Sequence, residues 1–308
     1  MTKKLKILFM GSPEFAVTAL NALVESEHEV VGVVTATDKL GGRGGNQIIE
    51  SEVKKYSLLK NLNILQPKNL KNPNFIKEIT KLNADIFIVV AFRMLPEIVW
   101  NIPRLGTFNI HGSLLPAYRG AAPINWAIIQ GENQTGVTMF KLQHDIDTGS
   151  ILSQSIIDIF EDDDFGSVYE RLKKVGAELL MSSLNDISNE HYTLIPQDDT
   201  KASHAPKIFH ETCLIDFNKK TEEVKNFVRG LSPYPAAHFK FYDQEMKVYK
   251  VSSIIEAHHM SPGTIVMEGK KKLKVACKDG YVDILDLKLE GKKRMNPSDF
   301  LNGYKTKE

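Results

Sequence analysis

Three polar residues in this chain have the types and spacing to do chemistry: Asn109, His111 and Asp147. Asn109 and His111 lie two residues apart in a strand predicted over residues 107–111, so both side chains project from one face. Polar side chains at the end of a buried strand must find partners or face a cavity. Asp147 precedes Thr-Gly, a turn that can aim its carboxylate at a neighbouring strand end. An amide donor, an imidazole and an anion that favours the charged imidazole suit acyl transfer to an amine.

The loop after this strand supports the catalytic interpretation. A lone histidine at a strand end more often belongs to a hydrogen-bonded turn. Here the following glycines and prolines form a stiff polar loop where α/β sheets bind their ligands. Ser113 lacks the G-x-S-x-G sequence of a nucleophile elbow. We therefore expect direct transfer and no covalent intermediate.

The first two-thirds of the chain alternates short apolar strands with helical segments. This pattern predicts a doubly wound, mainly parallel, Rossmann-like sheet with ligands beyond the carboxyl ends of its strands. Ser12 is predicted to cap the first helix, with Pro13 in its first turn. The predicted strands span residues 6–10, 29–35, 64–66, 85–91, 107–111 and 136–142.

The remaining third has a different pattern. We expect an N-terminal domain over residues 1–189, a polar, proline-bracketed linker over 190–207, and a C-terminal domain over 208–308. The C-terminal domain is predicted to be a small, OB-like β-barrel behind a helix at residues 221–229. Its predicted strands span residues 237–242, 245–252, 263–267, 272–277 and 281–289.

Composition limits the classes of function. The 308 residues carry a net charge of +1, so no global field draws the molecule to a polyanion. Residues 208–308 contain 18 Lys and Arg against 14 Asp and Glu, so a bound nucleic acid would contact this part. Cys213 and Cys277 are too far apart for a metal motif and indicate a reducing compartment. No apolar run is long enough for a signal peptide or a membrane span, which predicts a cytoplasmic protein with no membrane partner.

Longer motifs around the three polar residues resemble a known family, the formyl-folate transferase superfamily. They are Asn109-Ile-His111-Gly-Ser-Leu-Leu-Pro116, Arg119-Gly-Ala-Ala-Pro-Ile124 and Asp147-Thr-Gly149. The resemblance implies a catalytic trio of Asn109, His111 and Asp147. It also implies that 10-formyltetrahydrofolate donates the formyl group, that no metal takes part, and that the folate is held by Ser113, Leu114, Leu115 and Pro116. Arg93-Met94 departs from the family pattern near the pterin pocket.

The resemblance extends to the C-terminal third and implies an acceptor. The Arg-Gly-Ala-Ala-Pro-Ile loop and the C-terminal blocks imply the amine of methionyl initiator tRNA as the acceptor. We expect the protein to be a monomer. Arg43 stands in a glycine-rich segment that in this family enters the acceptor end of the tRNA. The basic clusters are expected to follow the phosphates, although such runs are often only solvated turns. They consist of Lys270, Lys271, Lys272, Lys292, Lys293 and Arg294.

Other interpretations remain open at this point. A formyltransferase acting on an amino-sugar nucleotide would share the trio, and a non-catalytic tRNA- or folate-binding module would share the fold. A dinucleotide-dependent dehydrogenase is disfavoured, because Gly11-Ser-Pro lacks the glycine fingerprint. The acidic run Glu161–Asp164 precedes a predicted helix at residues 166–181, so capping explains it better than a metal site.

Overall fold

The computed structural model describes residues 3–41 and 45–304 and resolves them into two compact units. Unit 1 comprises residues 1–120, 136–157 and 169–204, and unit 2 comprises residues 121–135, 158–168 and 205–308. The predicted boundaries at residues 189 and 207 stay a prediction. Within the described ranges, no helix is both long enough and apolar enough to traverse a bilayer.

Unit 1 is built on a seven-stranded sheet whose order is β10-β9-β7-β6-β1-β2-β5. Five of these strands are parallel: β1 (Lys6–Gly11), β2 (Glu29–Val34), β5 (Ile64–Leu65), β6 (Ile86–Val90) and β7 (Thr107–His111). They confirm the predicted mainly parallel sheet. The predicted strand at 136–142 is β9 (Gln134–Lys141), which runs antiparallel to β7. β10 (Ile151–Asp158), at the edge of the sheet, was not predicted.

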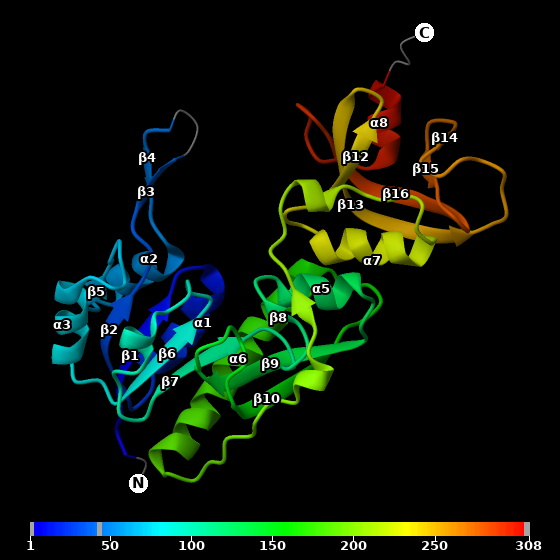
Figure 1. Ribbon diagram of the computed structural model, residues 1–308. Helices are drawn as coiled ribbons and strands as arrows, with labels where there is room; N and C mark the ends of the chain where they lie inside the picture. The colour runs from blue at the N-terminus through cyan, green and yellow to red at the C-terminus, as the bar shows by residue number, and fades with distance from the viewer. Residues whose placement is uncertain (1–2, 42–44, 305–308) are drawn as a thin grey trace. The chain divides into compact units, whose positions relative to one another are not determined.

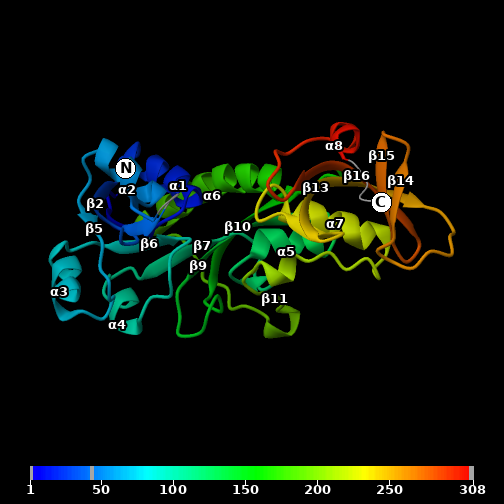
Figure 2. The same cartoon turned by 90° about the horizontal axis from the view of Figure 1, so that it is seen from above.

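Helices cover both faces of this sheet, as Figure 2 shows. α1 (Glu14–Val24) and α6 (Phe165–Ser188) share one face, where Phe15 meets Tyr169 edge to face. The opposite face packs against α3 (Pro73–Lys81) and α4 (Glu97–Trp100) in an apolar cluster. α2 (Glu52–Leu59) precedes β5, and β3 (Lys39–Gly41) pairs with β4 (Gln47–Ile49) in a separate hairpin (Figure 1).

Two predicted helix starts have different outcomes. The prediction that Ser12 caps α1 is wrong, because the N-cap position is Pro13 and the Ser12 hydroxyl instead accepts a hydrogen bond from the Ala36 N–H. The acidic run before α6 does cap that helix. The Asp164 carboxylate accepts a hydrogen bond from the Ser167 N–H, and Asp163 accepts one from the Ser167 hydroxyl.

Unit 2 carries a five-stranded antiparallel sheet in the order β12-β13-β16-β15-β14. Its strands are β12 (Ala237–Phe241), β13 (Gln244–Ile255), β14 (Ile265–Glu268), β15 (Lys272–Ala276) and β16 (Gly280–Leu289). All five were predicted, within a few residues at each end. β12 and β14 are the two edge strands of this sheet and do not pair with each other in the described part of the chain. Partly open barrels of the OB type have such edges.

Unit 2 also contains α5 (Pro123–Ile129), α7 (Thr221–Leu231), α8 (Pro297–Gly303) and the first residues of α6. α5 and α7 pack closely: the Asn125 side chain donates to the Gly230 carbonyl oxygen, and a Cβ on Gly230 would lie 2.6 Å from the Ile129 side chain. α7 buries Val224 and Val228 in the core of the sheet. β8 (Arg119–Gly120), β11 (His204–Ala205) and the short 3-10 helices η1 (Asp199–Lys201) and η2 (Glu211–Cys213) complete the elements.

Candidate active site

The strand β7 places Asn109 and His111 on one face of the sheet. Ile110, between them, faces α6, since a Cβ on Gly176 of that helix would lie 3.5 Å from the Ile110 side chain. Alternation along the strand therefore turns Asn109 and His111 toward the opposite face. Asn109 is half-buried and His111 is buried. His111 is the last residue of β7, at the carboxyl end where parallel sheets bind ligands.

His111 and Asp147 lie together in the structure. The distance from His111 Nδ1 to Asp147 Oδ2 is 3.7 Å, and the two side chains are only 7% and 14% exposed. On its other side, His111 Nε2 lies 2.9 Å from the Tyr118 carbonyl oxygen, which can only accept, so Nε2–H donates there. The 3.7 Å separation is longer than a hydrogen bond and within the range of an ion pair with a charged imidazole.

The turn that carries Asp147 has an unusual backbone. Asp147 has φ of 56°, a left-handed conformation that aspartate tolerates better than most residues. A Cβ on Gly149 would lie 1.8 Å from the Lys141 carbonyl oxygen, so only glycine fits there. The Gly120 N–H donates to Asp147 Oδ2 at 2.9 Å, with Gly120 at φ of 127°. Both glycines are therefore required to hold the Asp147 carboxylate beside His111.

Gln197 fixes the same turn from the predicted linker, and sequence reasoning missed it. Its side-chain amide donates to the carbonyl oxygens of Asp147 and Gly149, each at 2.8 Å. Its oxygen accepts from Arg119 Nε at 3.1 Å and from Arg119 Nη2 at 2.7 Å. Arg119 also pairs with the exposed Asp199. The available signal was a glutamine in a polar stretch, which by itself indicates nothing.

Side chains of β9 and β10 hold the loop Ser113–Pro116 in place through hydrogen bonds to its backbone. The buried Thr138 hydroxyl donates to the Ser113 carbonyl oxygen at 2.7 Å and accepts from the Leu115 N–H at 3.1 Å. Gln154 donates to Thr138 Oγ1 and to the Leu115 carbonyl oxygen. The fully buried Ser113 hydroxyl donates within the loop, to the Ala117 carbonyl oxygen. Leu114 and Pro116 are half-buried, and Leu115 is buried.

The basic residues predicted to bind tRNA differ in their surroundings. Arg43 lies outside the described residues. Lys270 and Lys271 are exposed in the turn before β15, Lys272 is exposed in its first position, and Lys292 and Lys293 are exposed after β16. The Arg294 guanidinium binds both oxygens of Asp286, at 2.6–3.0 Å, and lies 4.0 Å from the Tyr249 ring centroid.

Arg93, the departure noted in the sequence, donates to the carbonyl oxygens of Pro67 and Lys68. These two residues line a cavity of about 480 Å³ between β5 and α3. Arg93 thus stabilises the segment between β5 and α3.

Comparison with known proteins shows the family to which the chain belongs. The family model described as formyl transferase matches residues 3–184, and the model for the formyl transferase C-terminal domain matches residues 207–305. A methionyl-tRNA formyltransferase of Bacteroides thetaiotaomicron is 48% identical over 310 residues, covering 98% of this chain and 96% of that protein. One from Flavobacterium johnsoniae is 47% identical over 306 residues, with 98% and 96% covered.

Solved structures show the same fold. An N-formyltransferase from Helicobacter canadensis, in complex with folinic acid and dTDP-3-aminofucose, superimposes with a TM-score of 0.68 at 19% identity. The match covers 94% of this chain and 100% of that chain. At this identity the likeness concerns the fold alone.

Proposed function

The chain belongs to the formyl transferase family and functions as a methionyl-tRNA formyltransferase, and from this premise we propose which of its residues carry the reaction. The reaction moves the formyl group of 10-formyltetrahydrofolate to the free amino group of methionyl initiator tRNA, for translation initiation. Curated relatives at 45–48% identity along nearly the whole chain favour this acceptor over an amino-sugar nucleotide. They also favour an enzyme over a non-catalytic binding module.

We propose that Asn109, His111 and Asp147 are the catalytic residues. The methionyl amine, with an ordinary pKa of roughly 7.7–8.0, attacks the formyl carbon in its neutral form. As the new C–N bond forms, the Asn109 amide donates a hydrogen bond to the formyl oxygen, which gains negative charge. His111 takes the proton that the amine loses and turns its Nε2–H from the Tyr118 carbonyl oxygen to the formyl oxygen. Asp147 stabilises the protonated imidazole. The bond to the folate nitrogen then breaks, and His111 passes the proton to that nitrogen, so the His111–Asp147 pair ends the reaction as it began.

One observation carries this proposal: His111 Nδ1 lies 3.7 Å from Asp147 Oδ2 at the end of the strand that also bears Asn109. Successive residues on one strand face lie roughly 6.5–7 Å apart along the chain. An amide and an imidazole at that spacing can converge on one small carbonyl group between them. The hydrogen-bond donors Asn109 and His111 suit the formyl group of 10-formyltetrahydrofolate, and this chemistry requires no metal ion.

The loop Ser113–Pro116 is proposed to hold the folate. The Ser113 hydroxyl is committed to the Ala117 carbonyl oxygen, so Ser113 is expected to shape the loop from below. The half-buried side chains of Leu114 and Pro116 and the backbone of the loop are the groups proposed to contact the pterin. The buried Leu115 supports them.

Gln197 and Arg119 are proposed as positioning residues. Gln197 joins the Asp147 turn to the guanidinium of Arg119 through four hydrogen bonds. These bonds fix the backbone on which the Asp147 carboxylate rests, and they touch no reacting atom.

For the tRNA we propose a surface formed by Lys270, Lys271, Lys272, Lys292, Lys293 and Arg294, with Arg43 at the acceptor end. The role of Arg43 rests on the sequence. The exposure of the lysines supports phosphate contact, whereas Arg294 must give up or share Asp286 to reach a phosphate. We also propose that the C-terminal domain over residues 208–308 carries this surface, after a catalytic domain at 1–189 and a linker at 190–207.

We further propose that the enzyme acts as a monomer in the cytoplasm. Two free, buried cysteines, Cys213 and Cys277, support a reducing compartment. Sedimentation velocity over a range of protein concentrations tests the monomer, and a mass that doubles with concentration contradicts it.

The catalytic proposal is tested by an assay with purified protein, 10-formyltetrahydrofolate and methionine charged on initiator or elongator tRNA. Formyl-methionine is expected from the initiator tRNA. Loss of one oxyanion donor costs roughly 10²–10³ in turnover, so Asn109→Ala is expected to lose that much kcat with unchanged thermal unfolding. Asn101→Ala, at an exposed helix end, is the matched control. Wild-type turnover by Asn109→Ala would contradict the assignment.

A further inference from the structure

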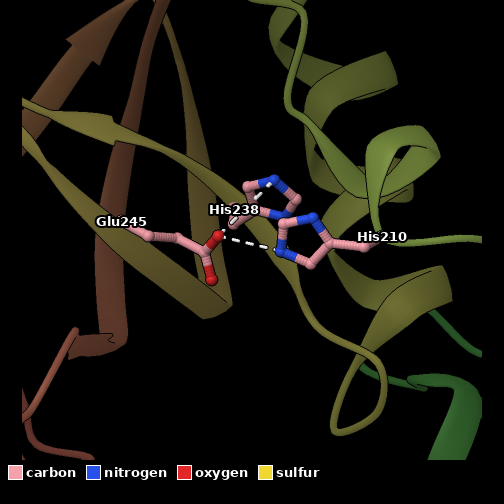
Figure 3. A group of neighbouring side chains, drawn as sticks. All are labelled: His210, His238 and Glu245. Carbon is pink, nitrogen blue, oxygen red and sulfur yellow. Dashed lines mark hydrogen bonds and ion pairs between the residues drawn. The ribbon is translucent and has the colours of Figure 1, made fainter.

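Three side chains with metal-ligating atoms converge in unit 2, away from the trio: His210, His238 and Glu245 (Figure 3). Their candidate ligand atoms all lie within 4.8 Å of one another. His210 Nε2 lies 2.9 Å from Glu245 Oε2, and His238 Nε2 lies 3.9 Å from the same oxygen. The Glu245 carboxylate therefore lies within reach of both imidazoles.

The hairpin of β12 and β13 fixes two of these residues. His238 pairs with Lys247 across the hairpin, and Lys240 pairs with Glu245. Opposed residues of an antiparallel pair share a face, so His238 and Glu245 are diagonal neighbours on the same face. The alternate residues, such as Phe239 and Met246, lie in the apolar core of unit 2. The two ligands thus stand on the face of the hairpin that the core does not fill.

The third residue arrives from the segment that leads into the hairpin. The Ile215 N–H donates to the His238 carbonyl oxygen at 2.8 Å, which lays this segment along β12. The Cys213 N–H donates to the His210 carbonyl oxygen at 3.0 Å, within the turn at η2. His210 is consequently held above His238, and the two rings stack with centroids 4.3 Å apart and planes at 21°.

The spacing of these atoms is close to that of a coordination shell. Zinc binds histidine nitrogen and carboxylate oxygen at roughly 2.0–2.2 Å, which sets neighbouring ligand atoms about 3.3–3.5 Å apart in a tetrahedron. The observed separations of 2.9 and 3.9 Å bracket this value.

We propose that His210, His238 and Glu245 form a binding site for a divalent transition-metal ion of the zinc class. Two imidazoles and one carboxylate suit such ions, whereas Mg²⁺ and Ca²⁺ prefer shells made of oxygen. Because His210 is exposed, the remaining coordination positions are open to water. The positive charge of Lys247 acts on His238 and opposes the binding of a cation. The ion would tie the segment at residues 209–215 to the hairpin and take no part in formyl transfer.

The test uses the full chain, stripped with a chelator and titrated with ZnCl₂ by calorimetry. We expect one zinc per chain and no comparable binding of MgCl₂. Zinc at about 100 times its Kd should raise the unfolding midpoint by roughly 5–10 °C. Co²⁺ in place of zinc should give visible absorption bands whose intensity reports the coordination number.

Two variants keep the test independent of folding. His210 is exposed, so His210→Ala should fold as the wild type does while its zinc affinity falls at least tenfold. Glu245→Gln removes the charged ligand, and the same loss is expected. His259→Ala, at an exposed histidine of the same unit, is the matched control and should bind zinc normally. Failure of zinc to saturate the wild type, or equal affinity in all four proteins, overturns the proposal. Neither result bears on formyl transfer, which the tRNA assay measures separately.

Discussion

The replacement Gln197→Ala tests whether the Asp147 turn needs support from the predicted linker. The substitution removes four hydrogen bonds, two to backbone carbonyls and two from the Arg119 guanidinium. A neutral hydrogen bond contributes about 0.5–1.5 kcal/mol net, and one to a charged group about 1.5–3 kcal/mol. Relaxation and water recover part of this sum. Displacement of a catalytic group by about 1 Å costs up to 10² in rate. We therefore expect kcat to fall roughly 10- to 100-fold.

The assay measures initial rates of formyl transfer over a range of each substrate. Because Gln197 touches no reacting atom, kcat should fall while KM for the tRNA changes less than about threefold. Asp199→Ala is the matched control. Asp199 is 80% exposed and pairs with the same guanidinium, so its loss should leave kcat near the wild-type value.

Thermal unfolding of the same proteins separates positioning from general stability. A lower unfolding midpoint is expected for Gln197→Ala, but the assay is run well below it. The reasoning is refuted if Gln197→Ala unfolds earlier and yet turns over at the wild-type rate. It is equally refuted if Asp199→Ala loses as much kcat as Gln197→Ala.

Three further predictions concern the support of the loop Ser113–Pro116 and the proposed tRNA surface. Thr138→Val should destabilise the protein by roughly 1–3 kcal/mol in urea unfolding, because it leaves buried partners of the hydroxyl unpaired; an unchanged midpoint would contradict this. Replacing Lys270–Lys272 by alanine should lower the slope of log K against log salt for tRNA by up to about 3, whereas Lys77→Ala should not alter it. Asp286→Ala should release Arg294 and strengthen tRNA binding at low salt, and unchanged or weaker binding would show that Arg294 makes no phosphate contact.

Much of the sheet could be predicted because buried strands appear in the sequence as runs of apolar residues. Strands covered on both faces consist almost wholly of apolar residues, as in β6, and β7 was bounded correctly at both ends. β10 was missed because it lies at the edge and alternates half-buried with exposed residues, a pattern that its polar serines and glutamine obscured. The antiparallel direction of β9 depends on the path of the connection before it. The pattern of apolar residues gives no information about that path.

The candidate site was predicted in part. The positions of Asn109 and His111 follow from strand periodicity and the place of the strand end. The partners of Asp147 do not, because Gln197 lies 50 residues along the chain in a stretch without regular structure. Charge counting likewise failed to show that Arg294 is paired with Asp286. In both cases a long-range contact decides the role, and composition carries no information about it.

The residues that hold the candidate site in place lie outside the sequence motifs that predict it, for a physical reason. Polar groups at the end of a buried strand are shielded from water, so each of them needs a hydrogen-bond partner within the protein. The motif supplies the proposed reacting groups, while Thr138 and Gln154 pair with the backbone of the loop Ser113–Pro116 and Gln197 pairs with that of the Asp147 turn. Because these supports contact backbone, they constrain geometry without adding reactive groups near the formyl carbon. Substitution of Gln197 should therefore alter turnover more than substrate affinity, and the set of residues on which activity depends is larger than the three proposed catalytic residues.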